Sequence, residues 1–80
     1  MLQVTIVSPQ EIIFQGEARC VIVPGEAGIF EIGSFHRPVI SLLLPGRIVV
    51  DEQAFDIQRG VVKVVADTVT ALIDPPSSDQ

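Results

Sequence analysis

The sequence is poor in charge and in the side chains on which most enzyme chemistry depends. Its 80 residues include five Lys and Arg, ten Asp and Glu, one His and one Cys. Five scattered cations and a net charge of −5 leave no basic stripe, so nucleic acid is excluded as an expected partner. The single cysteine, Cys20, has no partner for an internal disulfide and fits a reducing compartment.

Long hydrophobic runs are also missing. The longest, such as Val39–Leu44 with Ser41 inside it, fall far short of the roughly 18 residues of a membrane-spanning helix, so we expect no direct membrane insertion. Hydrophobic residues nevertheless make up 48% of the chain, which excludes intrinsic disorder. A domain of this size buries only about 60% of its unfolded surface. With 19% charged residues it must expose apolar area, which marks an interface with a partner.

The composition favours strands over helices. Valine and isoleucine supply 22 of the 80 residues, and no segment carries a long apolar stripe of helical period. Glu52-Gln53 and Asp67-Thr68 are expected as tight hairpin turns. The expected strands are a segment from Leu2 to Ser8-Pro9, then Glu11–Gln15, Glu17–Val23, Ile29–Ile32, Val39–Leu44, Arg47–Asp51, Ala54–Gln58, Val61–Ala66 and Val69–Ile73.

Eight or nine short strands separated by turn signals predict an all-β fold, a small antiparallel β-sandwich or barrel. We expect one β-sandwich domain over residues 1–74. A disordered polar tail is expected over residues 75–80. In Val61–Ala66 only Lys63 is polar, so one face of that strand is expected to point outward and to be covered by a partner.

The few reactive side chains do not form a recognisable catalytic or metal-binding pattern. Cys20 stands in an apolar stretch, where cysteine behaves as a small hydrophobe. One His and one Cys cannot supply the roughly four ligands of a zinc site. Asp51 and Glu52 lie at an expected hairpin tip, where solvated charge is the ordinary explanation. The segment Gly25–Gly28 is predicted to be a turn, because it lacks the residues of a phosphate-binding loop. We therefore predict no catalytic, cofactor-binding or metal-binding residues.

One segment, Gly33–Pro38, is unusual because Phe35, His36 and Arg37 stand together between two apolar strands. Aromatic and arginine side chains are enriched as anchors of protein interfaces. The alternative is that Phe35 caps the end of the sandwich while His36 hydrogen-bonds a turn carbonyl. The residues alone leave both interpretations open.

Several segments, taken in order, resemble the epsilon subunit of F-type ATP synthases. The resemblance covers about residues 2–74. This chain is similar to the short members of that family, which consist of the N-terminal β-sandwich alone. The residues that carry the resemblance are Val4–Pro9 with Phe14, Gly16 and Glu17, then Val23–Ile32, His36–Pro38 and Leu44–Gly46, and finally Phe55–Val62 and Val69–Asp74.

The resemblance implies a non-catalytic rotor subunit in the central stalk of a proton-transporting ATP synthase. It implies the gamma subunit and the c-ring as partners, within a complex that also holds alpha and beta subunits, and no cofactor. It further implies a peripheral location at the cytoplasmic face of a bacterial inner membrane, and coupling of rotation to ATP synthesis. The family's brake on ATP hydrolysis lies in a C-terminal helical hairpin. We expect this chain to have no C-terminal helical hairpin and therefore to lack the brake.

The resemblance also suggests where the c-ring is contacted. The segment that matches the family's ring-facing loop is Ile29–Pro38. The candidate contact residues within it are Ile29, Glu31, Phe35, His36 and Arg37.

Two other functions stay open on the residues alone. A free-standing β-sandwich module that binds a ligand, or a peptide strand at a sheet edge, would explain the apolar surface and the loop. A small hydrolase or thiol enzyme would use Cys20 and His36. Neither alternative explains the ordered set of matching segments.

Overall fold

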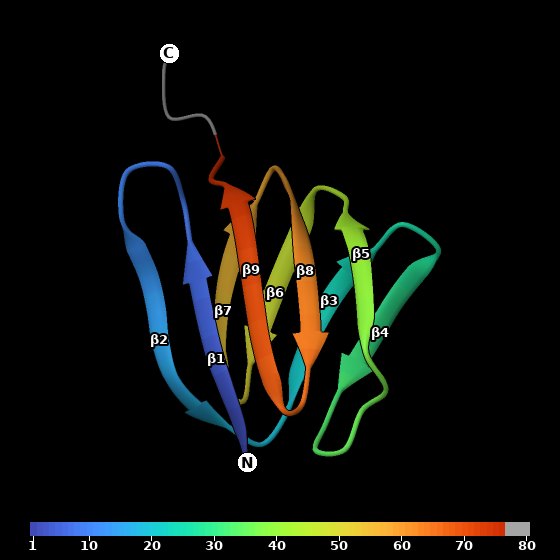
Figure 1. The fold of residues 1–80 in the computed structure, drawn as a ribbon. Helices are drawn as coiled ribbons and strands as arrows, with labels where there is room; N and C mark the ends of the chain where they lie inside the picture. The colour runs from blue at the N-terminus through green and yellow to red at the C-terminus, as the bar shows by residue number, and fades with distance from the viewer. Residues whose placement is uncertain (77–80) are drawn as a thin grey trace.

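The structure, a computed structural model, describes residues 1–76, which form nine β-strands and no helix. The predicted all-β class is therefore confirmed (Figure 1). The strands are β1 (Leu2–Val7), β2 (Ile12–Ala18), β3 (Val21–Gly25), β4 (Gly28–Ile32), β5 (Val39–Leu43), β6 (Gly46–Val50), β7 (Gln53–Ile57), β8 (Arg59–Val65) and β9 (Thr68–Asp74).

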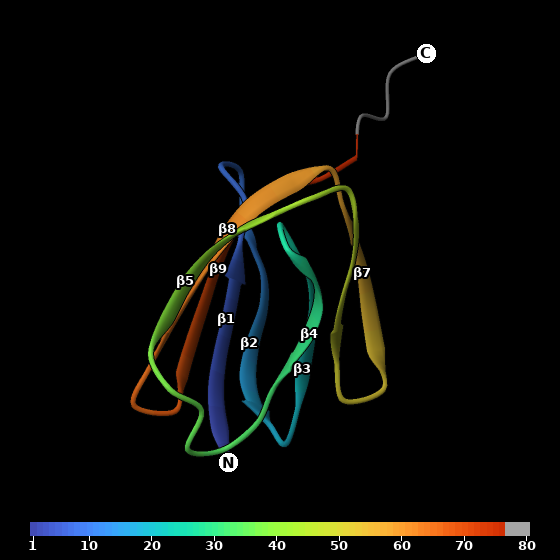
Figure 2. The same ribbon diagram turned by 90° about the vertical axis from the view of Figure 1, so that its right-hand side faces the viewer.

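The strands form one sheet that curls into two layers (Figure 2). One layer has the order β2-β1-β9-β8-β5, and the other consists of β4, β3, β6 and β7. The two layers are joined where Gly25 on β3 pairs with Leu43 on β5. On the opposite side the rings of Phe14 on β2 and Phe55 on β7 lie 5.8 Å apart, so side chains close the sandwich there.

The pairing of the first and last strands differs from the antiparallel arrangement that we expected. β1 and β9 run parallel, from the Gln3–Thr68 pair to the Val7–Leu72 pair, so the sheet is mixed. Hairpin turns, which the sequence does reveal, always produce antiparallel neighbours. β1 and β9 are the first and last strands and no turn connects them, so no local sequence signal indicates that they pair.

Two hairpin turns lie one residue earlier than predicted. The turns are Asp51-Glu52 between β6 and β7, and Ala66-Asp67 between β8 and β9. Ala66 and Asp67 both have positive φ values, of 50° and 61°. Two consecutive left-handed residues match the twist of the flanking strands, which explains a two-residue turn at this point.

The single strand predicted at Glu17–Val23 is wrong, because the chain breaks there into β2 and β3 at Arg19 and Cys20. The backbone N–H groups of these two residues donate to Oδ1 of Asp51, at 3.0 and 3.1 Å. The Asp51 N–H in turn donates to the Cys20 carbonyl at 3.0 Å. The connection between β2 and β3 is thus held by hydrogen bonds to the β6–β7 turn and not by strand pairing.

The core is apolar and comes from every strand. In β1 the inward residues Leu2, Val4 and Ile6 are buried, and the residues between them are exposed or half-buried. All the buried side chains of the described chain are hydrophobic. Of the tail predicted at 75–80, Pro75 and Pro76 are exposed and outside any strand, and the remainder lies beyond the described residues.

Candidate interaction surfaces

The outer face of the five-stranded layer carries one continuous row of apolar side chains. Leu42 on β5 is paired with Val61 on β8, and Val61 with Leu72 on β9. Leu72 is paired in turn with Val7 on β1, and Val7 with Ile12 on β2. We call these five residues the apolar row. Side chains alternate along a strand, and the opposite face of β5, β8, β9 and β1 already fills the core, so Leu42, Val61, Leu72 and Val7 point outward. A bulge shifts the register of β1 and β2 at the Val7–Ile12 pair, and Ile12 is 60% exposed there.

Three of the five side chains of the apolar row are strongly exposed. Leu42 is 57% exposed, Leu72 53% and Ile12 60%, whereas Val7 and Val61 are half-buried. Adjacent exposed apolar side chains on a small domain mark a surface that a partner covers. On β8 itself the outward apolar residues are Val61 and Val65, which is 43% exposed, so the outward apolar face expected from its sequence is present.

Polar residues border the apolar row on its central strands. One outward position further along the strands stand Lys63 on β8, Thr70 on β9 and Thr5 on β1. Ile40, the partner of Lys63 on β5, is apolar and 71% exposed. On the other side Arg59 Nε lies 2.9 Å from Asp74 Oδ2 in an exposed ion pair. The apolar surface is therefore narrow on β8, β9 and β1 and wider on β5.

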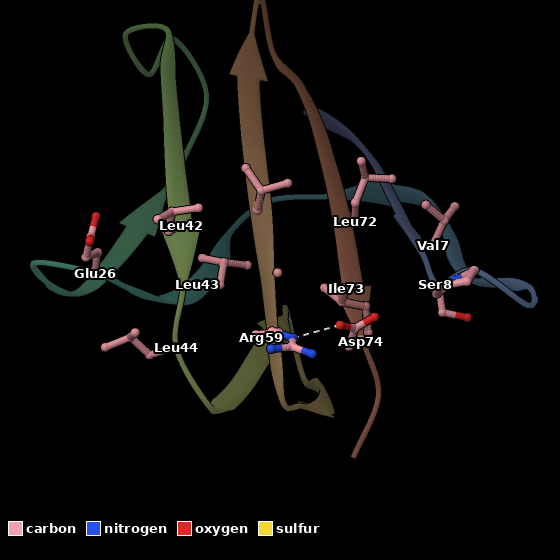
Figure 3. Close-up of a pocket in the computed structure, with 13 residues that line it drawn as sticks. Val7, Ser8, Glu26, Leu42, Leu43, Leu44, Arg59, Leu72, Ile73 and Asp74 are labelled. Atoms are coloured by element: carbon pink, nitrogen blue, oxygen red, sulfur yellow. Dashed lines mark hydrogen bonds and ion pairs between the residues drawn. The ribbon is translucent and has the colours of Figure 1, made fainter. Parts of the chain in front are cut away.

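A groove of about 630 Å³ follows the apolar row toward the end of the sandwich that holds the β1–β2 turn (Figure 3). Leu42, Leu72 and Val7 project into it from three strands. Leu44 and Glu26 line its rim and also line a second hollow, on the outer face of the other layer. The apolar surface thus continues around the end of the molecule, from one layer to the other.

The loop Gly33–Pro38 lies at the opposite end, near the N-terminus and the β8–β9 turn (Figure 1). Phe35 is 94% exposed and has a φ of 65°. Its backbone N–H donates to Oδ1 of Asp67 at 2.8 Å. Phe35 therefore does not cap the sandwich but projects into solvent.

His36 is held within the same loop. Its ring stacks on that of Phe30, with ring centres 6.3 Å apart. Its Nδ1 donates to the carbonyl of Arg37 at 2.8 Å, which is the turn-carbonyl contact of the alternative interpretation that the residues left open. His36 is thus a structural element of the loop, and Phe35 and Arg37 are left as its exposed side chains.

The five candidate contact residues fall into two groups. Phe35, His36 and Arg37 lie together in the loop. Ile29 and Glu31 lie on β4, and both point outward from that strand. Ile29 is about 13 Å along the strand from the start of the loop, and it lines the second hollow. The structure therefore separates Ile29 from the loop.

Cys20 contacts Glu31. The thiol donates to Oε2 of Glu31 at 2.9 Å. This hydrogen bond, together with burial and the charges of Glu31 and Asp51, raises the pKa of the Cys20 thiol from 9.0 to about 11. A thiol that stays protonated is a poor nucleophile. Cys20 is therefore neither an apolar core residue nor an activated catalytic group.

Two aspartates that the sequence analysis treated as ordinary turn residues anchor distant segments. Asp51 and Asp67 stand in hairpin turns with φ values of 53° and 61°, and each accepts backbone N–H groups from a segment more than 30 residues away. Aspartate tolerates left-handed backbone and offers a short acceptor. Turn chemistry could have identified the two positions, but their partners depend on the tertiary fold.

The described part of the chain contains no group of metal ligands and no membrane-spanning helix. Among residues 1–76, no three His, Cys, Asp or Glu side chains are grouped so that they could hold one. The same residues include no helix that is long and apolar enough to cross a membrane.

A small β-sandwich with an exposed apolar row and a projecting loop has the features of a class of protein, the small β-sandwich binding domain. Comparison with known proteins identifies the family. The chain belongs to the family of the ATP synthase delta/epsilon chain, beta-sandwich domain, whose match covers residues 1–75. The resemblance found in the sequence is thereby confirmed.

Individual relatives agree with this assignment. The chain is 40% identical to the ATP synthase epsilon chain of Bordetella petrii and 39% identical to that of Xanthomonas campestris pv. campestris. These alignments cover 91% and 86% of this chain but only 60% and 53% of the two relatives. The chain thus spans a little over half the length of these curated relatives.

The fold is also found in solved assemblies. One is the central stalk and c-ring of the Tetrahymena thermophila mitochondrial ATP synthase, with a TM-score of 0.74 and 19% identity over 91% of this chain and 63% of that chain. Another is the Euglena gracilis mitochondrial ATP synthase, with a TM-score of 0.82 and 18% identity over 90% of this chain and 49% of that chain. At these identities the likeness concerns the fold.

Proposed function

We propose that this chain is a non-catalytic rotor subunit in the central stalk of a proton-transporting F-type ATP synthase. It binds the gamma subunit and the c-ring, within a complex that also contains alpha and beta subunits, and couples rotation to ATP synthesis. Its place is peripheral, at the cytoplasmic face of a bacterial inner membrane. The observation that carries the proposal is the apolar row on a chain of the delta/epsilon family.

The groove beside the apolar row is assigned to the gamma subunit. Permanent interfaces are more hydrophobic than transient ones, and the exposed apolar side chains of the row continue at Leu44, which is 48% exposed and lines the same groove. A subunit that transmits torque needs a contact that does not slip. On β8 and β9, where Lys63 and Thr70 stand on one side of the row and Arg59 and Asp74 on the other, sliding along the strands would bring polar residues against an apolar partner.

The loop and the outer face of β4 are assigned to the c-ring. Phe35 and Arg37 are exposed at the end of the sandwich remote from the groove, so the two partners can be bound at the same time. Glu31 extends this surface along β4, and His36 orders the loop from within. Ile29 is the candidate contact farthest from the loop and lies beside the second hollow. A mixed aromatic and charged surface suits partner loops that are polar.

The assignment of the loop is tested by the double variant Phe35→Ala with Arg37→Glu. Both side chains are exposed, so the isolated domain is expected to unfold at the same temperature as the wild type. Recovery of the c-ring with the tagged chain is expected to fall several-fold. The control adds the same amount of negative charge at two exposed positions of β7 that line neither the groove nor the second hollow, as Gln53→Glu with Ala54→Glu, and is expected to leave recovery unchanged. Equal recovery with the loop variant would remove the loop from the interface.

We also propose that this β-sandwich exerts no brake on ATP hydrolysis. The family's brake is helical, and residues 1–76 form strands and connecting segments only. Removing the chain from the purified complex is then expected to leave the hydrolysis rate per complex within about twofold, a factor that corresponds to less than 0.5 kcal/mol of barrier. A several-fold activation would contradict the proposal.

A further inference from the structure

We propose that Asp67 is a positioning residue for the loop, and that its carboxylate holds the backbone in the conformation that projects Phe35 toward the c-ring. The inference rests on the proposed function of the loop and deepens it, because it assigns the geometry of that contact to a residue outside the contact. The observation is the 2.8 Å hydrogen bond from the Phe35 N–H to Asp67 Oδ1.

The loop conformation at Phe35 requires an external support. Phe35 has a φ of 65°, a value that bulky residues rarely adopt, and its side chain is 94% exposed and makes little packing contact. Within the loop the His36 N–H reaches the Gly33 carbonyl at 3.3 Å, which is a long hydrogen bond. Strained backbone persists only where the surrounding structure holds it. The short bond from Asp67 supplies that hold.

Asp67 is itself fixed by the strands around it. It forms the β8–β9 turn with Ala66, and both residues are left-handed. Its carbonyl accepts the N–H of Gln3 at 2.8 Å, which ties the turn to the start of β1. The carboxylate is therefore presented from a rigid turn of the layer that carries the apolar row, so the loop has a fixed position relative to the groove.

The side chain at position 67 must meet two requirements, and substitutions can separate them. It must tolerate left-handed backbone, as Asp, Asn and Gly do. It must also reach the Phe35 N–H with an acceptor oxygen, as Asp and Asn can and Gly cannot. Asp67→Gly therefore keeps the turn and loses the anchor, and Asp67→Asn keeps both.

The experiment measures rebinding of the purified chain to ATP synthase from which the chain has been removed. We compare the wild type, Asp67→Gly, Asp67→Asn, Phe35→Ala, and the double variant Phe35→Ala with Asp67→Gly. Asp67→Gly is expected to weaken rebinding about tenfold, to speed amide exchange at Phe35 and to leave the unfolding midpoint unchanged. Asp67→Asn is expected to bind like the wild type. In the Phe35→Ala background Asp67→Gly is expected to add no further loss, because the two residues act through one contact.

The outcomes separate this inference from the proposed function. If Phe35→Ala binds as tightly as the wild type, the loop is not a contact and the proposed function of the loop fails. If Phe35→Ala weakens rebinding but Asp67→Gly does not, the role of Asp67 is wrong and the loop contact stands. Equal losses from Asp67→Gly in both backgrounds would also overturn the inference, because Asp67 would then act independently of Phe35.

Discussion

Val61 on β8 and Leu72 on β9 face each other across the antiparallel ladder, on the side of the sheet that points away from the core. Apolar pairs in that position normally face the interior of a sandwich. Here the neighbouring residues Val62 and Ala71 fill the interior, so these strands are apolar on both faces. The outer pair is the centre of the apolar row, the surface that we propose the gamma subunit covers.

Charge introduced into the apolar row is expected to prevent docking without unfolding the domain. Leu72→Asp places a carboxylate where a hydrophobic partner would have to desolvate it, so binding of the gamma subunit is expected to weaken at least about tenfold. The matched control is Val65→Asp, on the same outer face but beside the polar residues Thr68 and Lys63. It is expected to bind like the wild type in the same titration. Equal effects of the two substitutions would show that the groove is not the docking site.

The Cys20 thiol is expected to be unreactive near neutral pH. Its pKa is raised to about 11 by the hydrogen bond to Glu31, so little thiolate is present at pH 8. Glu31→Ala removes that bond and is expected to speed alkylation by iodoacetamide at least about tenfold, since a fall of one pKa unit increases the thiolate tenfold. Glu26→Ala is the control and is expected to leave the rate unchanged. A wild-type rate as fast as that of an unfolded peptide would contradict the contact.

The raised pKa of the Cys20 thiol also makes the stability of the domain depend on pH. The folded thiol holds its proton more tightly than the unfolded thiol, because its pKa is about 11 in place of 9.0. The stability that this provides is fully present below pH 9 and is lost as the pH rises toward 11. Urea denaturation of the wild type should therefore show a steeper loss between these pH values than Cys20→Ser does. If the free energy of unfolding of the wild type and of Cys20→Ser fell equally between these pH values, Cys20 would not contribute to the pH dependence of stability.

Asp51 is expected to stabilise the connection between β2 and β3. Asp51→Ala removes the acceptor for the N–H groups of Arg19 and Cys20 and disfavours the left-handed turn, so the free energy of unfolding is expected to fall by about 1–2 kcal/mol. Asp51→Asn keeps an acceptor oxygen and the backbone preference, so it should lose less than half as much. The urea midpoint measures both. An Asp51→Ala midpoint equal to that of the wild type would refute the anchoring role.

Two glycines of the chain differ sharply in what a side chain would meet. A Cβ at Gly60 would lie 2.5 Å from the Leu72 carbonyl oxygen and 2.9 Å from Cγ2 of Ile73, whereas a Cβ at Gly33 would meet open space. Gly60→Ala is therefore expected to destabilise the domain by roughly 2 kcal/mol or more through overpacking. Gly33→Ala is expected to change the unfolding midpoint little. Equal midpoints for the two variants would contradict the close approach of β8 and β9.

The local features of the fold could be predicted from the sequence. The alternation of Leu2, Val4 and Ile6 is a property of one strand, and Pro45-Gly46 marks a boundary by its own backbone chemistry. Both hairpin turns were predicted one residue too late along the chain. The reason is that a left-handed aspartate such as Asp67 fits either position of a two-residue turn, so the sequence does not distinguish the two placements.

The features that depend on distant pairing could not be predicted. The outward apolar face of β8 was expected, but its alignment with Leu72, Val7 and Ile12 requires the strand register and the parallel β1–β9 pair. The anchoring of Phe35 by Asp67 joins residues 32 positions apart, and no local pattern indicates it. The loop residues Phe35, His36 and Arg37 were found together because they are neighbours in the chain.

The central claim, membership of the rotor, is tested most directly by affinity purification of the tagged chain from gently solubilised membranes of its own host. Mass spectrometry identifies what is recovered, with Leu72→Asp run in parallel. The proposal predicts recovery of gamma, alpha, beta and c subunits with the wild type and their loss with Leu72→Asp. Recovery of the chain alone, or with unrelated soluble proteins, would contradict it and would show that this sandwich acts as an independent binding module.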